Sequence, residues 1–264
     1  MGRVVAVVNQ KGGVGKTTTT VNLAAALAMA GKRVLLVDSD AQASASSGFG
    51  VTPRELDKSL YAVLLDERPT RRSVASVIVQ SELRPLAILP SGPDLYAAEV
   101  ELAAEADRFD RLRRVLDTVA DAFDVILIDC PPSLGVLTLN AMAAADGVLV
   151  PMQCEYYALE GLTQLARTID RVRDGINPNL SIQGVLLTMF DPRNNLARQV
   201  AADVRKHFGK RVYRAVIPRN IRLSEAPSFG RPALLYDPQS AGSKSYAALA
   251  REFLQKAPSA VQAA

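Results

Sequence analysis

Short apolar runs alternate with longer stretches of helical periodicity along most of the chain. The runs are rich in Val, Ile and Leu and are bounded by turn residues, which is typical of strands covered on both faces. This alternation predicts an α/β fold, a doubly wound and mostly parallel sheet flanked by helices and built with right-handed crossovers. The predicted strands are 4–8, 34–37, 86–89, 125–128, 147–150, 184–187 and 212–217, and the predicted helices are 17–30, 108–121, 155–173, 194–208 and 240–256, with shorter ones near 57–65 and 71–79.

The organisation of the chain favours one domain over residues 1–256, followed by a frayed tail at 257–264. The 264 residues are 48% hydrophobic and 22% charged, which is typical of a soluble globular protein. No apolar run approaches the roughly 18 residues of a membrane span, and we expect no signal peptide. Two cysteines, Cys130 and Cys154, make no disulfide framework. A cytoplasmic protein is therefore expected.

The first loop with chemical potential follows the first predicted strand and reads NQKGGVGKTT. In parallel α/β sheets ligands bind beyond the carboxyl ends of the strands, so this is where a site should lie. The strict phosphate-loop pattern requires glycine where the chain has Gln10, yet the glycines and the following helix N-terminus suit a polyphosphate. Lys16 supplies a charge for the β- and γ-phosphates, and Thr17 supplies a hydroxyl for Mg²⁺.

A second lysine in this loop, Lys11, gives the pattern KGGVGKT, and here the chain resembles a known family. The pattern is similar to that of the ParA/Soj partition ATPases, P-loop NTPases of the deviant Walker A type and relatives of MinD and of the nitrogenase iron protein. The resemblance covers roughly residues 2–256. It implies that Lys11 reaches the nucleotide of a second subunit in an ATP-bound homodimer, and a cation supplied in this way can raise the rate about 10³- to 10⁵-fold. The nucleotide-binding residues expected in this loop are Lys11, Gly12, Gly13, Val14, Gly15, Lys16, Thr17 and Thr18.

The second loop, VDSDAQASASSG, follows the second predicted strand. Asp40 could orient an attacking water, and the resemblance makes it the catalytic carboxylate of the first switch loop, beside the catalytic Lys11 and Lys16. Taken without the family, an Asp-x-Asp pattern is a weak signal because aspartates often end strands. Family members usually have proline where this chain has Ala41, so we expect a looser backbone around Asp40.

The third loop, DVILIDCPPSLG, carries Asp129 at the end of an apolar strand. An acid in this position fits a Walker B carboxylate, and we expect Thr17, Asp40 and Asp129 to hold Mg²⁺. Cys130 is interpreted as a packing residue. The alternative is a ligand of an iron–sulfur cluster, which would need cysteines at positions where this pattern does not place them.

The distribution of charge points to a second function. Residues 1–150 have a net charge of −3 and residues 151–264 have a net charge of +7. Residues 193–231 contain ten Lys and Arg against two acids, Asp203 and Glu225. Such an excess indicates either a surface for a polyanion or an ordinary solvated basic face.

The same segment carries the family pattern PRNIRLSEAPS. The resemblance implies adenine contacts at Pro218, Arg219 and Asn220, although Arg219 could serve nucleotide or DNA. It also implies non-specific contacts with DNA phosphates, each of which steepens the salt dependence by roughly 0.9 on a log–log plot. The candidates are Arg193 and Arg222, with Lys206, Lys210 and Arg211 as weaker ones. His207 is interpreted as a surface residue rather than a catalyst.

The function predicted from these observations is an ATP-driven switch for DNA partition and chromosome segregation. An ATP-bound sandwich dimer would bind DNA non-specifically, and hydrolysis stimulated by a ParB/Spo0J-type partner would release it. The cofactors would be ATP and Mg²⁺, the protein would associate with the nucleoid, and no membrane would take part. One alternative is a membrane-associated positioning ATPase of the MinD type, which needs a C-terminal amphipathic helix rich in Lys and Arg. Another is a metabolic P-loop enzyme such as a carboxylate–amine ligase, which needs a dedicated substrate pocket.

Overall fold

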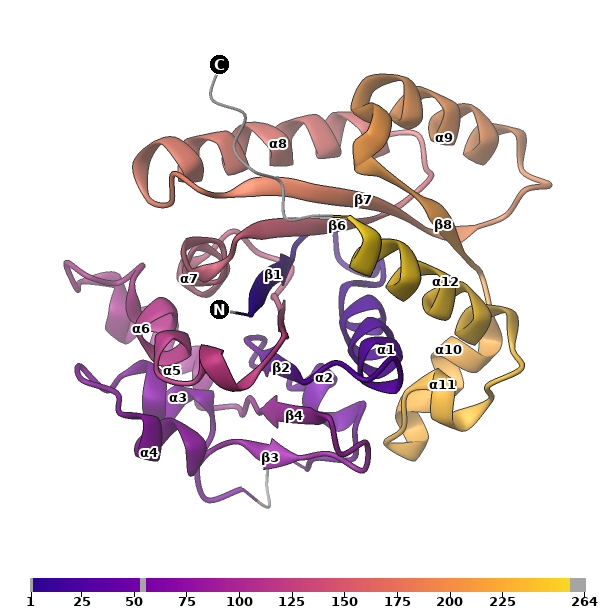
Figure 1. Ribbon diagram of the computed structural model, residues 1–264. Helices are drawn as coiled ribbons and strands as arrows, with labels where there is room; N and C mark the ends of the chain where they lie inside the picture. Colours follow the sequence, from indigo (N-terminus) through magenta and orange to yellow (C-terminus); the bar gives the residue numbers. More distant parts are fainter. Residues whose placement is uncertain (1, 53–55, 257–264) are drawn as a thin grey trace.

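A computed structural model describes residues 2–52 and 56–256, and within these ranges eight strands form one sheet (Figure 1). The strand order is β3-β4-β2-β5-β1-β6-β7-β8. Neighbouring strands are parallel except β3 and β4, which are antiparallel. The strands are β1 (Arg3–Val7), β2 (Val34–Asp38), β3 (Val79–Gln80), β4 (Leu86–Leu89), β5 (Val125–Asp129), β6 (Gly147–Gln153), β7 (Ser181–Phe190) and β8 (Val212–Pro218).

The predicted doubly wound sheet is confirmed, and each of the seven predicted apolar runs coincides with a strand, although Val8 lies one residue beyond the end of β1. The strands β2 and β5 are buried along their whole length, as continuous Val, Ile and Leu runs require in a sheet covered on both faces. The sequence did not predict β3, because two residues are too few to show a period. The predicted tail at 257–264 lies outside the described residues.

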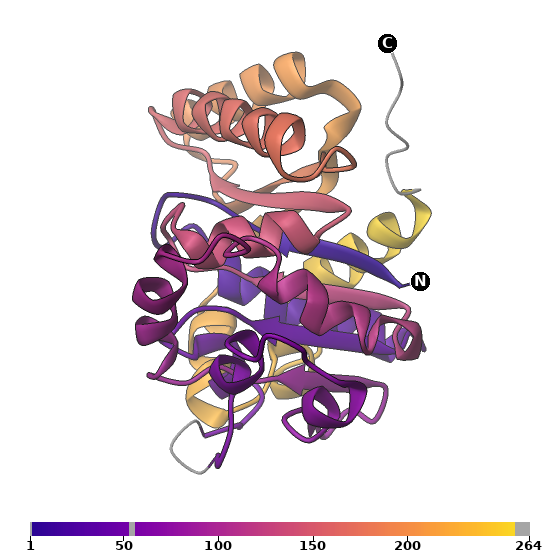
Figure 2. The same cartoon turned by 90° about the vertical axis from the view of Figure 1, so that its left-hand side faces the viewer.

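Helices cover both faces of the sheet (Figure 2). One face packs against α3 to α9, and the other packs against α1, α2 and α10 to α12. The α-helices are α1 (Lys16–Met29), α2 (Ser44–Ser47), α3 (Leu60–Leu64), α4 (Arg71–Ala75), α5 (Leu95–Ala103), α6 (Arg111–Asp117), α7 (Val136–Ala144), α8 (Ala158–Gly175), α9 (Asn195–Phe208), α10 (Ile221–Glu225), α11 (Ala233–Tyr236) and α12 (Ala241–Gln255). Three short 3₁₀ segments complete the described set, η2 (Ala120–Ala122), η3 (Gly209–Arg211) and η4 (Ala226–Phe229).

Two substantial helices, α5 and α7, escaped the sequence prediction. Helix α7 reads VLTLNAMAA and has no charged residue, so it lacks the polar face that makes a helix recognisable from its period. The predicted helix 108–121 is also shorter than expected. Its regular part is α6, and the 3₁₀ segment η2 follows after a break.

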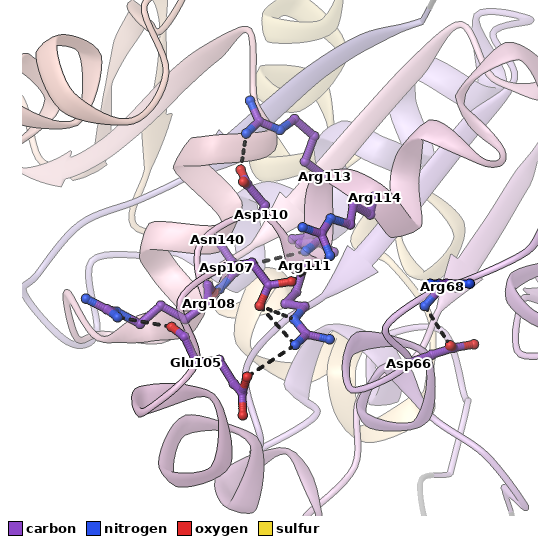
Figure 3. Close-up of polar contacts among 11 residues, drawn as sticks. Asp66, Arg68, Glu105, Asp107, Arg108, Asp110, Arg111, Arg113, Arg114 and Asn140 are labelled. Atoms are coloured by element: carbon purple, nitrogen blue, oxygen red, sulfur yellow. Dashed lines mark hydrogen bonds and ion pairs between the residues drawn. The ribbon is translucent and has the colours of Figure 1, made fainter.

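Buried polar contacts fasten α7 to α6. Asn140 of α7 accepts a hydrogen bond from the Leu112 backbone N–H (3.1 Å) and donates one to the Val136 carbonyl (2.9 Å). Beside it, the Arg111 guanidinium is only 5% exposed and lies 2.9 Å from Asp107. Figure 3 shows these two side chains pointing toward each other. Because α7 begins directly after the third predicted loop, this cluster fixes the direction in which that loop leaves the sheet.

The first strand and the last helix are joined by one side chain. The Arg3 guanidinium donates to the carbonyls of Phe253 (3.1 Å) and Lys256 (2.9 Å), and it lies over the Phe253 ring. Figure 2 shows the C-terminal end of α12 beside the N-terminal strand. Burial lowers the pKa of Arg3. The chain thus closes on itself at the amino ends of the strands, away from the loops that carry the chemistry.

Candidate active site

The strand order explains why three loops meet. The central strands β2, β5 and β1 are adjacent, and Asp129 is in register with both Asp38 and Val7. Their carboxyl ends therefore open side by side, and the loops that follow share one edge of the sheet. The sequence placed each acid at the end of a strand, and the pairing register brings them together.

The phosphate loop connects β1 to α1. Gly13 and Gly15 have φ of +74° and +88°, conformations that only glycine adopts without strain. A Cβ at Gly12 or Gly13 would have no neighbour within 4 Å, so the loop surrounds open space. Gly15 caps α1 without a side-chain hydrogen bond, which leaves the first N–H groups of the helix directed at that space. This arrangement fits a polyphosphate group.

Lys16 lies at the base of the loop and is only 7% exposed. Its Nζ is 3.5 Å from the Lys11 carbonyl oxygen, the one hydrogen-bond acceptor found for it among the described residues. Burial lowers the pKa of Lys16, and the nearby charges of Asp129 and Asp40 oppose that shift. A buried ammonium group with so few partners is arranged to receive an anion.

Asp129 gathers two hydroxyl groups from α1. The Thr17 hydroxyl donates to Oδ2 (2.7 Å) and the Thr20 hydroxyl donates to Oδ1 (2.8 Å). Asp129 is fully buried, and burial together with the charge of Asp38 raises its pKa. Thr17 and Asp129, both predicted as magnesium ligands, therefore lie in direct contact, with oxygen donors of the kind that Mg²⁺ prefers.

The first switch loop is anchored by Asp38, to which the sequence analysis assigned no role. Asp38 is fully buried and accepts from the Ser46 N–H (2.8 Å), the Ser46 hydroxyl (2.7 Å) and the Asp40 N–H (3.2 Å). Burial raises its pKa. The predicted catalytic residue, Asp40, is partly exposed and accepts from the Gln42 N–H (3.0 Å). The turn that follows holds Ala43 at φ +52°, a strained conformation for alanine.

Lys11 lies on the outside of the loop. Its side chain is 56% exposed, and its ammonium group is paired with Glu155, which follows β6. Asn9 stabilises the turn by accepting from the Lys11 N–H (3.0 Å) and donating to the Pro151 carbonyl (2.7 Å). In this chain Lys11 therefore points away from the phosphate space that Lys16 faces, and its reach toward a second subunit stays a prediction.

A cavity of about 300 Å³ adjoins the phosphate loop. Pro218, Arg219 and Asn220, predicted from the resemblance to contact adenine, line it at the end of β8. Met189 lines the same cavity at φ +47°, a strained value for a residue with a side chain. The cavity also borders Gly13, Gly15 and Thr18, so a base and its phosphates could occupy the two spaces together.

The structure separates the predicted DNA-binding residues into two groups. Arg193 and Arg222 lie near the carboxyl end of β8, whereas Lys206, Lys210 and Arg211 lie near its start. Arg193 is held by Asp191 through two contacts of 3.0 and 2.9 Å. Arg222 is held by Glu225 (2.8 Å) and Asp237 (3.2 Å). Both of these candidates are therefore paired with acids of the same chain in exposed ion pairs, as Lys11 is.

Three further residues belong to this site but were not predicted: Thr20, Asp38 and Glu155. Thr20 had a readable signal, because it is three residues after Thr17 and so lies on the same face of a helix. Asp38 had the signal of an acid ending a buried run. Glu155 had none, because its contact with Lys11 spans 144 residues.

Both cysteines, Cys130 and Cys154, are buried and free. Within residues 2–52 and 56–256, no group of three or more His, Cys, Asp or Glu side chains is arranged to hold a metal ion.

His207 is exposed, and its Nδ1 lies 2.8 Å from the Asp203 carbonyl oxygen of the same helix. In the part of the chain that is described, no helix is both long and apolar enough to cross a membrane.

Comparison with known proteins agrees with this geometry. A family model described as an AAA domain matches residues 2–182. The chain is 56% identical to the chromosome partitioning protein ParA of Caulobacter vibrioides, over 96% of this chain and 94% of that protein. It is 51% identical to the sporulation initiation inhibitor protein Soj of Bacillus subtilis, over 96% of this chain and 98% of that protein.

Solved structures share the fold. The cobyrinic acid a,c-diamide synthase of Mycobacterium smegmatis, with bound ADP and magnesium, has a TM-score of 0.82 and 38% identity, with 97% of this chain and 95% of that chain covered. The cell division ATPase MinD of Pyrococcus furiosus has a TM-score of 0.77 and 31% identity, with coverage of 97% and 100%.

Proposed function

We propose that this chain, which belongs to the ParA/Soj family of chromosome-partitioning ATPases, uses ATP as a switch that controls its hold on DNA. The family and its partitioning role rest on relatives more than half identical over nearly the whole chain. The observation that carries the mechanism is the position of the two loop lysines. Lys16 is buried against the phosphate space, and Lys11 is exposed on the same loop, where a second molecule could meet it.

The chain is an ATPase, and its cofactors are ATP and Mg²⁺. The open loop around Gly12 and Gly13 fits the phosphates, and Lys16 would contact their outer oxygens. Thr17 and Asp129 would hold the magnesium ion, since the hydroxyl and the carboxylate already converge. When bound there, Mg²⁺ would offset the charge that develops on the transferring phosphoryl group.

Asp40 would position the water that attacks the γ-phosphate. Its carboxylate is partly exposed at the edge that the phosphate loop shares, and its charge is felt by Lys16. A carboxylate of this kind acts mainly by orienting the water. Hydrolysis would then alter the loop that Asp38 and Ser46 anchor, as expected of a switch governed by the γ-phosphate.

Lys11 would leave Glu155 when two ATP-bound subunits meet and would contact the nucleotide of the partner subunit. Both side chains are about half exposed, so little free energy is needed to separate them. In the ATP-bound homodimer, each chain would bind double-stranded DNA without base readout and associate with the nucleoid in the cytoplasm. A ParB-type partner would stimulate hydrolysis and so release the DNA.

Two observations favour this function over the alternatives. A membrane-associated MinD-type role needs a helix with a free apolar face, yet α12 buries Tyr246, Leu249 and Phe253 against the sheet. A metabolic ligase role has support from one structural relative, the diamide synthase, but partition proteins match at higher identity.

The test is molecular size, measured by light scattering without nucleotide, with ADP and with ATP, in the presence and absence of a DNA duplex. We expect a dimer with ATP only, and Asp40→Ala should prolong the dimer because hydrolysis is slowed. The control is Lys11→Ala, which should bind ATP and stay monomeric. A wild-type chain that remains a monomer at high ATP concentration would contradict the proposal.

A further inference from the structure

Helix α5 contacts two of the loops that meet at the candidate active site. It packs against α3 and α7 on one face of the sheet, at the left of Figure 1. At its start, the Tyr96 hydroxyl is hydrogen-bonded to Gln42 of the first switch loop. One turn further along the helix, Glu99 lies against Gly135 in the third loop, six residues after Asp129. The helix therefore touches both loops that carry acids of the site.

The segment just before α5 is also fastened to the first switch loop. The Ser91 N–H donates to the Ser46 hydroxyl oxygen (3.2 Å), and that hydroxyl donates to Asp38 (2.7 Å). Asp38 is the buried carboxylate that anchors the first switch loop. Because a buried polar network holds its members rigidly, α5 and this loop should move together.

Glu99 carries a carboxylate oxygen that is buried without a partner. Its Oε1 atom and the Ser91 hydroxyl oxygen are the two buried side-chain atoms that lack a hydrogen bond in the described part of the chain. Both lie in or just before α5. Burying a carboxylate oxygen without a donor costs free energy, so an atom of this kind calls for a functional explanation.

The Glu99 carboxylate faces the start of α7. A Cβ at Gly135 would overlap Glu99 Oε1, so this approach is possible only because Gly135 has no side chain. Gly135 precedes α7 without a side-chain hydrogen bond to the first N–H groups of that helix. Those N–H groups and the nearby Ser133 hydroxyl are donors that a small movement of the third loop could bring to Glu99.

We propose that Glu99 is a positioning residue for ATP hydrolysis, which accepts a hydrogen bond from the third loop or the start of α7 when the nucleotide is bound. This inference rests on the proposed function, because the third loop begins at Asp129. A loop movement that supplies a donor is favoured by the hydrogen bond that Oε1 lacks in this structure. Glu99 does not line the cavity beside the phosphate loop, so it acts through the third loop rather than on the nucleotide.

Such a residue should support turnover without supporting the resting fold. Glu99→Ala removes the acceptor, and kcat should fall about tenfold, as expected when a contact that orients the region of a metal ligand is lost. The KM for ATP should not change, because Lys16 and the phosphate loop are untouched. Glu99→Gln keeps an oxygen acceptor and should recover most of the loss. Without nucleotide, the unfolding temperature of Glu99→Ala should not fall, since no hydrogen bond of Oε1 is lost.

The decisive comparison is a double-mutant cycle between Glu99→Ala and Gly135→Ala. The methyl group added at Gly135 displaces the carboxylate, and φ of −75° at Gly135 suits alanine. Each single variant should lower kcat about tenfold, and the double variant should be no slower than either, because both changes remove the same contact. The matched control is Glu101→Ala on the same helix, where the acid contacts the Tyr61 hydroxyl (3.1 Å), and its kcat should be unchanged.

Amide hydrogen exchange over residues 130–138 gives a readout that does not depend on turnover. A non-hydrolysable ATP analogue with Mg²⁺ should protect these amides in the wild type and in Glu101→Ala. In Glu99→Ala the gain in protection should be about tenfold smaller, because the loop has lost the group that holds it. Binding of the analogue and dimer size, measured on the same samples, should be normal in all three proteins.

The possible failures are distinguishable. A wild-type chain that stays monomeric with the analogue contradicts the proposed function itself. A wild-type dimer with additive effects in the cycle, or with equal protection in Glu99→Ala, overturns only the role of Glu99. A lower unfolding temperature of Glu99→Ala without nucleotide would also overturn it, since Glu99 would then support the fold.

Discussion

The two ends of β8 both carry arginine, but the arginines differ in their surroundings. At the carboxyl end, Arg193 and Arg222 are paired with acids a few residues away in the sequence or in the adjoining loop. At the amino end, Arg205, Lys210, Arg214 and Arg251 line a groove whose one acid among the described residues, Glu252, accepts hydrogen bonds from the backbone of β8. A count of charges along the sequence treats both ends alike. The difference shows that the location of the acids, as well as the number of bases, decides which cations have a partner within the chain.

The largest effect on ATP turnover is expected at Lys16, because no other buried cation of the described chain faces the phosphate space. Lys16→Ala should lower ATP turnover by a factor of about 100 or more, because the loop loses the buried charge that faces the phosphates. Phosphate release measures this effect. The matched change Lys32→Ala, at a partly exposed lysine beyond α1, should leave turnover unaffected. Turnover of Lys16→Ala within tenfold of the wild type would show that the loop works without that charge.

A smaller effect, on the Mg²⁺ dependence of turnover, is expected from a change at Thr20 in the same site. Thr20→Ala removes one of the two hydroxyls that hold Asp129, while Thr17 remains. Such supporting contacts typically change metal affinity or activity by about 10- to 100-fold. We expect the Mg²⁺ concentration for half-maximal turnover to rise about tenfold, measured by titration. An unchanged titration would mean that Asp129 is held well enough by Thr17 alone.

The comparison between the two ends of β8 can be sharpened by releasing a paired arginine. Asp191→Asn removes the carboxylate that holds Arg193 and should free one cation at the nucleotide end. The expected result is a salt slope steeper by about 0.9, measured as DNA binding with an ATP analogue. Asp174→Asn, on α8, provides the control for the change in net charge. Equal slopes in all three proteins would show that freeing Arg193 adds no phosphate contact.

The smallest effect concerns acid stability. The hydrogen bonds from Arg193 lower the pKa of Asp191 to about 2. A depressed pKa stabilises the fold above the unfolded value of about 3.9, and that contribution disappears as the pH falls toward 2. Arg193→Ala should therefore lower the unfolding temperature slightly at pH 7, by about 2 °C at most, and should not lower it at pH 2. Melting curves at the two pH values measure the difference, and a deficit that persists at pH 2 would contradict this account.

Much of the candidate site could be inferred from the sequence because its signals are local. The KGGVGKT loop, the acids at strand ends and the apolar runs each lie within a dozen residues, so local patterns were enough to select Lys16, Thr17 and Asp129 as candidates. The structure brings Thr17 and Asp129 into contact. Contacts across long separations could not be predicted in this way. The pairing of Lys11 with Glu155 depends on β1 and β6 being neighbours. The hydrogen bond from the Arg214 N–H to the Glu252 carboxylate depends on α12 packing against β8.

The join between Arg3 and the end of α12 has a consequence for biogenesis. The strand made first, β1, pairs with β5 and β6, which follow about 120 residues or more later in the chain. Its residue Arg3 donates hydrogen bonds to the carbonyls of Phe253 and Lys256, which are made later still. Contacts between residues so distant in the chain slow folding, because a large loop must close, at a cost in chain entropy, before the contact can form. The loop that follows β1 would therefore become rigid only after the segments that contain β5, β6 and the end of α12 have been made. ATP binding would then follow, rather than precede, the packing of these distant segments.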